Sequence, residues 1–328
     1  MFKKNKFIES ILSSFIDFFK KIKEDKKFRI NFILILAFLF IIVSANTFYR
    51  FSIYRFDKRD NFSLKYADFF NIPAIIINND KISYNEFIDD FDTLYYYYQK
   101  RNAENPDMPI VSSNDIKKEV KDKIIQDYFM FKIASDFGIK VTENEIENEF
   151  NEVVDQLGDA SKIEQAIFDA YSWTIDEFKE NVLKPFILKE KINSYISLND
   201  EINKEKKDFI SNIVLEMKDS DKDFSYFAKK YSEDIGSSEN GGDLGWILRG
   251  QMIEEFEDVV FSLEENEISD IFKTKYGYHI AKVSSRASIG EPEESVRVSH
   301  ILIRTKNLDT LINEEISNSK IKTKIKIY

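Results

Sequence analysis

Two runs of sequence near the C-terminus decide the fold of that part of the chain. They read Tyr278-His279-Ile280-Ala281-Lys282-Val283-Ser284 and Ser295-Val296-Arg297-Val298-Ser299-His300-Ile301. Each places apolar side chains at alternate positions, which is the period of a half-buried β-strand. Because a Gly/Pro/Glu loop centred near Ile289 and Gly290 joins them, the pattern predicts an antiparallel hairpin.

The expected register of this hairpin brings two histidines together. Pairing about the centre of the loop sets opposite one another His279 and His300, Ala281 and Val298, and Val283 and Val296. Both imidazoles then share an apolar face, and they are the only two histidines among the 328 residues. Because a buried polar group without a partner costs roughly 1–3 kcal/mol, we expect the rings to contact each other and Thr274.

Further blocks precede the hairpin in a fixed order. They are Asp223-Phe224-Ser225-Tyr226-Phe227-Ala228-Lys229-Lys230-Tyr231-Ser232-Glu233-Asp234, Gly241-Gly242-Asp243-Leu244-Gly245-Trp246, Arg249-Gly250-Gln251-Met252, Phe256-Glu257 and Tyr276-Gly277-Tyr278-His279-Ile280. In this order and spacing, residues 223–303 resemble the parvulin family of peptidyl-prolyl cis-trans isomerases. The resemblance implies an FKBP-like antiparallel sheet with flanking helices.

The resemblance also implies a site. Leu244, Met252 and Phe256, with Gln251 beside them, would bind the proline ring, although plain core packing is an alternative interpretation. Asp234 matches the acidic or thiol position beside the reacting amide, or is a surface-turn residue. Thr274 matches a hydroxyl in the surrounding hydrogen-bond network, and His279 and His300 would hold the geometry of the site. The isomerisation breaks no covalent bond, so we expect no cofactor and no metal.

The order of the strands departs from the family. Parvulins open with a strand containing Ser-His-Ile-Leu, whereas here Ser299-His300-Ile301-Leu302 follows the closing strand and the upstream candidate, residues 193–198, carries Tyr195 instead of histidine. Either the domain is circularly permuted, or a second parvulin domain begins there. The pairing of the two histidines favours permutation, and the 25 residues beyond Ile303 are too few for a second domain.

One segment is apolar enough to cross a membrane. Residues 30–49 carry no charge, and twenty helical residues span the roughly 30 Å hydrocarbon core. Residues 1–29 carry nine Lys/Arg against four Asp/Glu, so we expect the N-terminus in the cytoplasm and the bulk of the chain outside it. The family resemblance implies that the membrane is a bacterial inner membrane and that the bulk is periplasmic. A cleaved signal peptide ending near Val43-Ser44-Ala45 is the alternative. Tyr49 and Phe51 suit an aromatic belt, and residues 7–22 have the pattern of an amphipathic helix.

Composition excludes several function classes. Since the chain carries −11 and residues 1–29 carry +5, residues 50–328 carry −16, which argues against nucleic acid as a partner. The absence of cysteine excludes disulfides, thiolate catalysis and a lipid-modified cysteine anchor. Two histidines are too few for a His-rich metal site.

The middle of the chain reads as one strand followed by helices. Residues 73–77 form a β-branched run, Ser83 is expected to cap a helix, and further helices are predicted at 114–137, at 142–157 and from Thr174 to about 195 with a kink at Pro185. The phrase Asp136-Phe137-Gly138-Ile139-Lys140-Val141-Thr142 and the opening strand are similar to the N-terminal domain of the SurA, PrsA and PpiD foldases. An ordinary helical domain is the alternative.

These expectations define an α+β chain. Its predicted parts are a basic amphipathic segment 1–29, a transmembrane helix 30–49, a juxtamembrane linker 50–69, a SurA-like helical chaperone domain 70–198, a parvulin domain 199–305 including a helix at about 203–218, and a C-terminal part 306–328. In that last part, 307–319 reads as a helix and the alternating run 321–327 as a strand pairing with 73–77. The resemblance implies an isomerase and chaperone for newly exported polypeptides containing X-Pro bonds, or else an inactive holdase.

Overall fold

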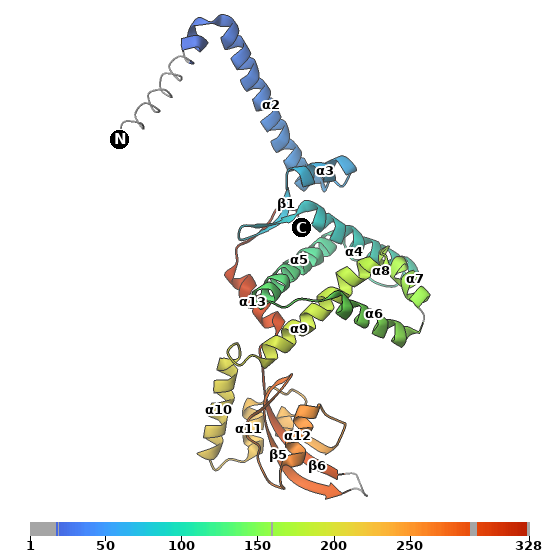
Figure 1. Ribbon diagram of the computed structural model, residues 1–328, viewed down its shortest axis with the longest axis vertical. Coiled ribbons are helices and arrows are strands. Elements are labelled where there is room, and N and C mark those ends of the chain that lie inside the picture. The colour runs from blue at the N-terminus through green and yellow to red at the C-terminus, as the bar shows by residue number, and fades with distance from the viewer. Residues whose placement is uncertain (1–17, 19, 159, 289–293, 327–328) are drawn as a thin grey trace, which may run out of the picture. The chain divides into compact units, whose positions relative to one another are not determined.

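The structure is a computed structural model that describes residues 18, 20–158, 160–288 and 294–326 (Figure 1). The described residues form two compact units. The first contains the N-terminal part up to Asp92, Ser112–Lys118 and the segment from Lys320, and the second contains Thr93–Val111 and Glu119–Ser319. Most of the predicted amphipathic helix at 7–22 lies outside the described residues.

Helix α2, Lys26–Phe56, is longer than the predicted span. It begins at Asp25, whose side chain accepts hydrogen bonds from the backbone N–H groups of Lys27 and Phe28, and it ends at Asp57 in the left-handed conformation, with φ of 46°. Among the described residues it is the one helix long and apolar enough to cross a membrane.

Residues 50–69 are folded, although we expected a linker there. Helix α2 continues to Phe56, and helix α3, Asn61–Phe69, begins after Asp60, whose carboxylate accepts from the backbone N–H of Ser63. Ile53 of α2 is fully buried, and the Tyr54 hydroxyl donates to the carbonyl of Pro73. Apolar packing and this hydrogen bond therefore hold the end of α2 within the first unit. Sequence periodicity alone does not reveal these contacts.

A three-stranded sheet in the order β2-β1-β7 completes the first unit. Its strands are β1 Pro73–Ile77, β2 Asp80–Ser83 and β7 Ile321–Thr323. The predicted pairing between 73–77 and the C-terminal run is confirmed, with Ile75 opposite Thr323, although the strand ends at Thr323 instead of 327. Strand β2 was not predicted; it is possible because Asn78 takes a left-handed φ of 56° and reverses the chain.

The two long helices α4, Tyr84–Glu104, and α5, Ser113–Asp136, contribute residues to both units. After α5 the chain forms α6 Glu143–Leu157, α7 Ala160–Tyr171, α8 Ile175–Phe178, the π-helical turn η1 Lys179–Leu183 and α9 Lys184–Leu198. At the start of the predicted helix 142–157, Thr142 forms a capping box with Glu145. The irregularity expected at Pro185 takes the form of this π-helical turn directly before it, because proline cannot donate to the preceding turn.

The second sheet is antiparallel, with the order β3-β6-β5-β4. Its strands are β3 Asp243–Leu248, β4 Phe272–Thr274, β5 Gly277–Ser288 and β6 Glu294–Arg304. Three helices accompany the sheet, α10 Lys204–Lys218, α11 Phe224–Tyr231 and α12 Glu254–Ser262, whereas α13 Leu308–Asn318 packs against α9, with the backbone N–H of Leu308 donating to the Asn193 side chain. Helices α10 and α11 pack on one face with Tyr278 and Ile280, and α12 packs on the other with Ala281 and Val283 (Figure 1).

The histidine strands are neighbours as predicted, but their predicted register is wrong by two residues. His279 lies opposite Leu302, and His300 lies opposite Ala281. A β-bulge between Val283 and Ser285 interrupts the pairing of the two strands. Alternation of apolar residues cannot fix the register, because a shift of two residues leaves every side chain on the same face of the sheet. Both imidazoles therefore still point to the α12 side. The circular permutation remains a prediction.

Candidate active site

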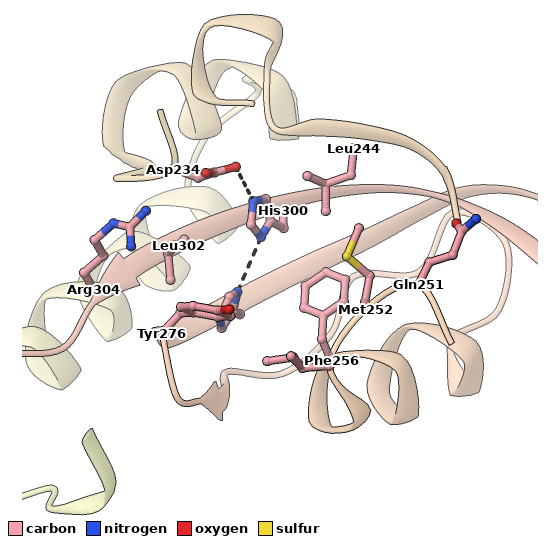
Figure 2. A pocket seen from close by; sticks show the side chains of 11 residues that line it. Asp234, Leu244, Gln251, Met252, Phe256, Tyr276, His300, Leu302 and Arg304 are labelled. Atoms are coloured by element: carbon pink, nitrogen blue, oxygen red, sulfur yellow. Dashed lines mark hydrogen bonds and ion pairs between the residues drawn. The ribbon is translucent and has the colours of Figure 1, made fainter. Parts of the chain in front are cut away.

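Four side chains form a continuous hydrogen-bonded line through the α12 face of the second sheet. Asp234 Oδ2 lies 2.9 Å from His300 Nε2, the two Nδ1 atoms of His300 and His279 lie 3.4 Å apart, and His279 Nε2 lies 2.8 Å from Thr274 Oγ1. Figure 2 shows the Asp234 and His300 members of this line. The sequence-predicted residues Asp234, His279, His300 and Thr274 are thus all brought together.

The line has one consistent direction of proton donation. Because the backbone N–H of Tyr276 donates to Thr274 Oγ1 at 3.1 Å, the threonine hydroxyl is free to donate to His279 Nε2. His279 then carries its proton on Nδ1 and donates to His300 Nδ1, and His300 donates from Nε2 to the Asp234 carboxylate. Both imidazoles are neutral in this arrangement, and each polar atom of the line has a partner.

The electrostatics of the line agree with neutral imidazoles. Burial, together with the smaller effect of the adjacent His300, lowers the pKa of His279 to about 3. Burial also lowers the pKa of His300, against the opposing effect of Asp234. Burial works to raise the pKa of Asp234, but the hydrogen bonds from Ser237 and His300 outweigh it and keep the pKa below its usual value. At neutral pH, Asp234 carries the one charge of the line.

This arrangement predicts that acid destabilises the sheet. The pKa of a histidine in the unfolded chain is near 6.5, whereas the pKa of each histidine in the folded chain is lower. Below pH 6.5 the unfolded chain therefore binds more protons than the folded chain, and stability is lost as the pH falls toward the pKa values of the folded chain. Below about pH 6.5, we expect the free energy of unfolding to fall by up to roughly 1.4 kcal/mol per pH unit for each histidine, and for His279 the loss continues down to its folded pKa of about 3. Urea unfolding followed by Trp246 fluorescence, in a Trp173→Phe background, measures this slope. The variant His279→Leu/His300→Leu should lose it, and an equal slope in both proteins would contradict the assignment.

The loop after α11 fixes Asp234 against strand β6. Ser232 Oγ accepts from the backbone N–H of Leu302 at 3.1 Å, and the backbone N–H of Glu233 donates to the carbonyl of Leu302 at 2.7 Å. Gly242, in the turn before β3, lies against the backbone of β6: its φ is 81°, and a Cβ there would come within 2.2 Å of the His300 carbonyl oxygen. Glycine is therefore required there to let the loop approach.

A cavity of about 520 Å³ opens beside the line. All four predicted substrate-binding residues border it, namely Leu244, Gln251, Met252 and Phe256, and so do Asp234, His279 and His300. Figure 2 shows Leu244, Met252 and Phe256 on one side of His300, and Leu302 and Arg304 on the other. Thr274 is buried and supports His279 instead of bordering the cavity.

The sequence interpretation missed the remaining lining residues, Ile253, Tyr276, Leu302 and Arg304. A signal for two of them was available, because side chains on one face of a strand recur every second residue. Leu302 and Arg304 follow His300 on β6 by two and four positions and so share its face. Tyr276 lies in the turn between β4 and β5, whose direction the sequence does not fix.

The carboxylate of Glu257 holds the loop that carries Met252. It accepts from the backbone N–H of Gly250 at 3.0 Å and from that of Met252 at 2.7 Å, and these bonds lower its pKa. Helix α12 thus supplies Phe256 to the cavity and, one residue later, fixes the loop above it. The cavity has an apolar wall on rigid elements and one ionised carboxylate at its edge, which suits an apolar ring joined to a polar amide.

Two family models match the chain. Residues 186–287 match the PPIC-type PPIase domain, and residues 15–190 match the SurA-like N-terminal domain. The first match contains Asp234, Thr274 and His279 and ends before the strand of His300.

Curated relatives agree with these matches. The chain is 31% identical over 194 residues to the foldase protein PrsA of Geobacillus kaustophilus, which covers 53% of this chain and 65% of that protein. It is 28% identical over 218 residues to PrsA of Staphylococcus aureus, covering 57% and 68%. The chain therefore spans about two thirds of the length of these relatives. The crystal structure of PrsA from Bacillus subtilis is 26% identical over 65% of this chain and 81% of that one, with a TM-score of 0.21.

Proposed function

This chain belongs to the family of the SurA-like N-terminal domain and carries a PPIC-type PPIase domain, and on that basis we propose that it is a membrane-anchored peptidyl-prolyl cis-trans isomerase. Its substrates are unfolded or newly exported polypeptides with X-Pro bonds, and its helical part acts as a chaperone. In this proposal residues 70–198 form the chaperone domain, 199–305 the isomerase domain, and 306–328 return to the chaperone domain.

One observation carries the proposal: an apolar cavity borders a buried line of neutral imidazoles that ends on an ionised carboxylate. Rotation about a peptide bond has a barrier of ~18–20 kcal/mol, which comes from amide conjugation. A site lowers it by binding the twisted amide better than the planar one, with polar groups that are already oriented. We assign the proline ring to Leu244, Met252 and Phe256, and the amide to the side of Asp234 and His300.

The anchor in this proposal is helix α2. The uncharged run 30–49 lies within it, and the excess of Lys/Arg before that run supports an N-terminus in the cytoplasm. The remainder of the chain is then extracytoplasmic, at the inner membrane of a bacterium, where exported chains emerge unfolded.

A second candidate function is a holdase that binds unfolded segments without catalysis. Large aromatic side chains exposed on the helices favour it; they include Phe131, Phe168, Phe186, Tyr95 and Tyr96. Such side chains offer apolar surface to an unfolded chain. The two candidates differ in whether the cavity residues matter.

Refolding of a client protein distinguishes them. The full-length chain in detergent micelles should accelerate a refolding phase limited by X-Pro isomerisation, which takes tens of seconds without a catalyst. Asp234→Ala should abolish most of that acceleration and leave suppression of client aggregation unchanged. Suppression of aggregation by the wild-type chain without any acceleration of the slow phase would instead establish the holdase.

A further inference from the structure

An aromatic cluster lies where α3 packs against α2. Its members are Tyr49, Phe62, Tyr66, Phe69 and Phe70, and their neighbouring ring centroids lie 4.5 to 6.5 Å apart. We call these five residues the aromatic collar. The collar takes no part in the cavity described above and lies in the first unit.

Two hydrogen bonds fix the height of α3 along α2. The hydroxyl of Tyr66 donates to the carbonyl of Asn46 at 3.3 Å, and the hydroxyl of Tyr49 lies 2.8 Å from Ser63 Oγ. Tyr49 is the last residue of the uncharged run 30–49. The collar therefore lies at the level where the apolar part of α2 ends, which is the boundary between hydrocarbon and water for a membrane-spanning helix.

The exposed residues of α3 include large aromatic side chains beside the polar Asn61, Lys65 and Asp68, although a helix in water normally turns its apolar side chains inward. Ser63 and Ala67 are buried against the protein, whereas Phe62 is 67% exposed, Phe69 81% and Phe70 40%. Phe48 and Phe51 of α2 are also exposed, so the apolar surface runs from α2 toward the collar. Lysines flank it, with the Lys58 ammonium 4.9 Å from the centre of the Tyr49 ring and Lys65 exposed on α3.

We propose that α3 is an interfacial helix whose collar inserts into the headgroup region of the leaflet opposite the N-terminus. The proposal rests on the anchoring of the chain by α2. Lipid is the occupant because the collar is continuous with the surface that α2 presents to lipid, and because aromatic rings flanked by lysines suit the polar boundary of a bilayer.

The consequence is that the first unit sits at a fixed height on the membrane. Ile53 is buried in that unit and Tyr54 is bonded to Pro73, so the end of α2 has no free linker. The collar adds a second lipid contact beside the span. Together they restrict how far the sheet β2-β1-β7 can tilt from the membrane surface.

Tryptophan fluorescence in lipid vesicles tests the proposal on the full-length chain. Trp173→Phe and Trp246→Phe remove the native tryptophans, and Phe69→Trp then places one reporter in the collar. Leu36→Trp reports on the middle of α2, and Phe168→Trp, an exposed phenylalanine of α7, is the matched control. The vesicles contain phosphatidylcholine and phosphatidylglycerol brominated either near the headgroup or deep in the acyl chains, and circular dichroism verifies that each variant folds.

The proposal expects Phe69→Trp emission to be blue-shifted and quenched most by bromine near the headgroup, while deep bromine quenches Leu36→Trp most and Phe168→Trp stays unquenched. If Leu36→Trp is quenched and Phe69→Trp emits as in water, the collar proposal is overturned and the anchor stands. A blue shift of Phe69→Trp without quenching would mean that protein covers the collar, which also overturns it. Without quenching of Leu36→Trp, the proposed anchoring fails as well. Equal quenching of Phe69→Trp and Phe168→Trp would show unspecific adsorption and overturn the collar.

Discussion

A chain carrying Phe256→Ala is expected to lose about 3–5 kcal/mol of unfolding free energy, the usual loss for a fully buried phenylalanine. Its side chain is 4% exposed and packs against both imidazoles, with ring centroids 5.6 Å from His279 and 5.7 Å from His300. Because Phe256 also forms the wall assigned to the proline ring, the isomerase kcat/KM should fall by roughly tenfold or more, beyond the loss due to unfolded protein. Urea unfolding and a proline-peptide assay measure the two effects.

Phe261→Ala is the matched control for that variant. Phe261 lies on the same helix α12 and is 5% exposed, but it does not border the cavity. It should lose a similar amount of stability while its folded fraction keeps the wild-type kcat/KM. If both variants lose catalytic efficiency equally per folded molecule, the assignment of Phe256 to the substrate is wrong.

Replacing the histidines by leucine should reveal energetic coupling between them. His279→Leu leaves His300 Nδ1 without its donor and Thr274 Oγ1 without its acceptor, and His300→Leu leaves the Asp234 carboxylate without its imidazole partner. Each orphaned buried group costs about 1–3 kcal/mol. The double variant loses the bond between the imidazoles only once, so its cost should be smaller than the sum of the single costs by roughly 0.5–3 kcal/mol.

A distant pair supplies the control for this cycle. Phe227 packs on the opposite face of the sheet, among the residues of α10 and α11. His279→Leu and Phe227→Leu should therefore add within about 0.5 kcal/mol. Additive costs for the two histidines would mean that the 3.4 Å contact between their Nδ1 atoms contributes no stability.

The sequence predicted most of the site because its signals are local or periodic. The alternation of apolar residues predicted that His279 and His300 lie on one face of the sheet. The two-residue error in register left that face unchanged, and the imidazoles meet through their Nδ1 atoms. The predicted helix 142–157 agrees with α6, Glu143–Leu157, because local residues mark both ends: Thr142 caps its start and Gly158 ends it in the left-handed conformation. The family blocks placed Phe256 and Met252 at the cavity.

What the sequence did not predict depends on tertiary packing. The folding of residues 50–69 onto α2 rests on single contacts, such as the bond between Tyr66 and Asn46, which leave no period in the sequence. Strand β2 needed the left-handed turn at Asn78. Arg304 borders the cavity because β6 continues past Leu302 to Arg304. The sequence did not predict this, because the alternation of apolar residues does not show where a strand ends.

The most direct test of the account is exchange NMR on a peptide with one X-Pro bond, mixed with a small amount of the full-length chain in detergent micelles. Without catalyst the isomers interconvert over tens of seconds, too slowly for exchange within one second. We expect cis-to-trans exchange peaks with the wild-type chain and their loss with Asp234→Ala. Absence of exchange peaks with folded wild-type protein would contradict it.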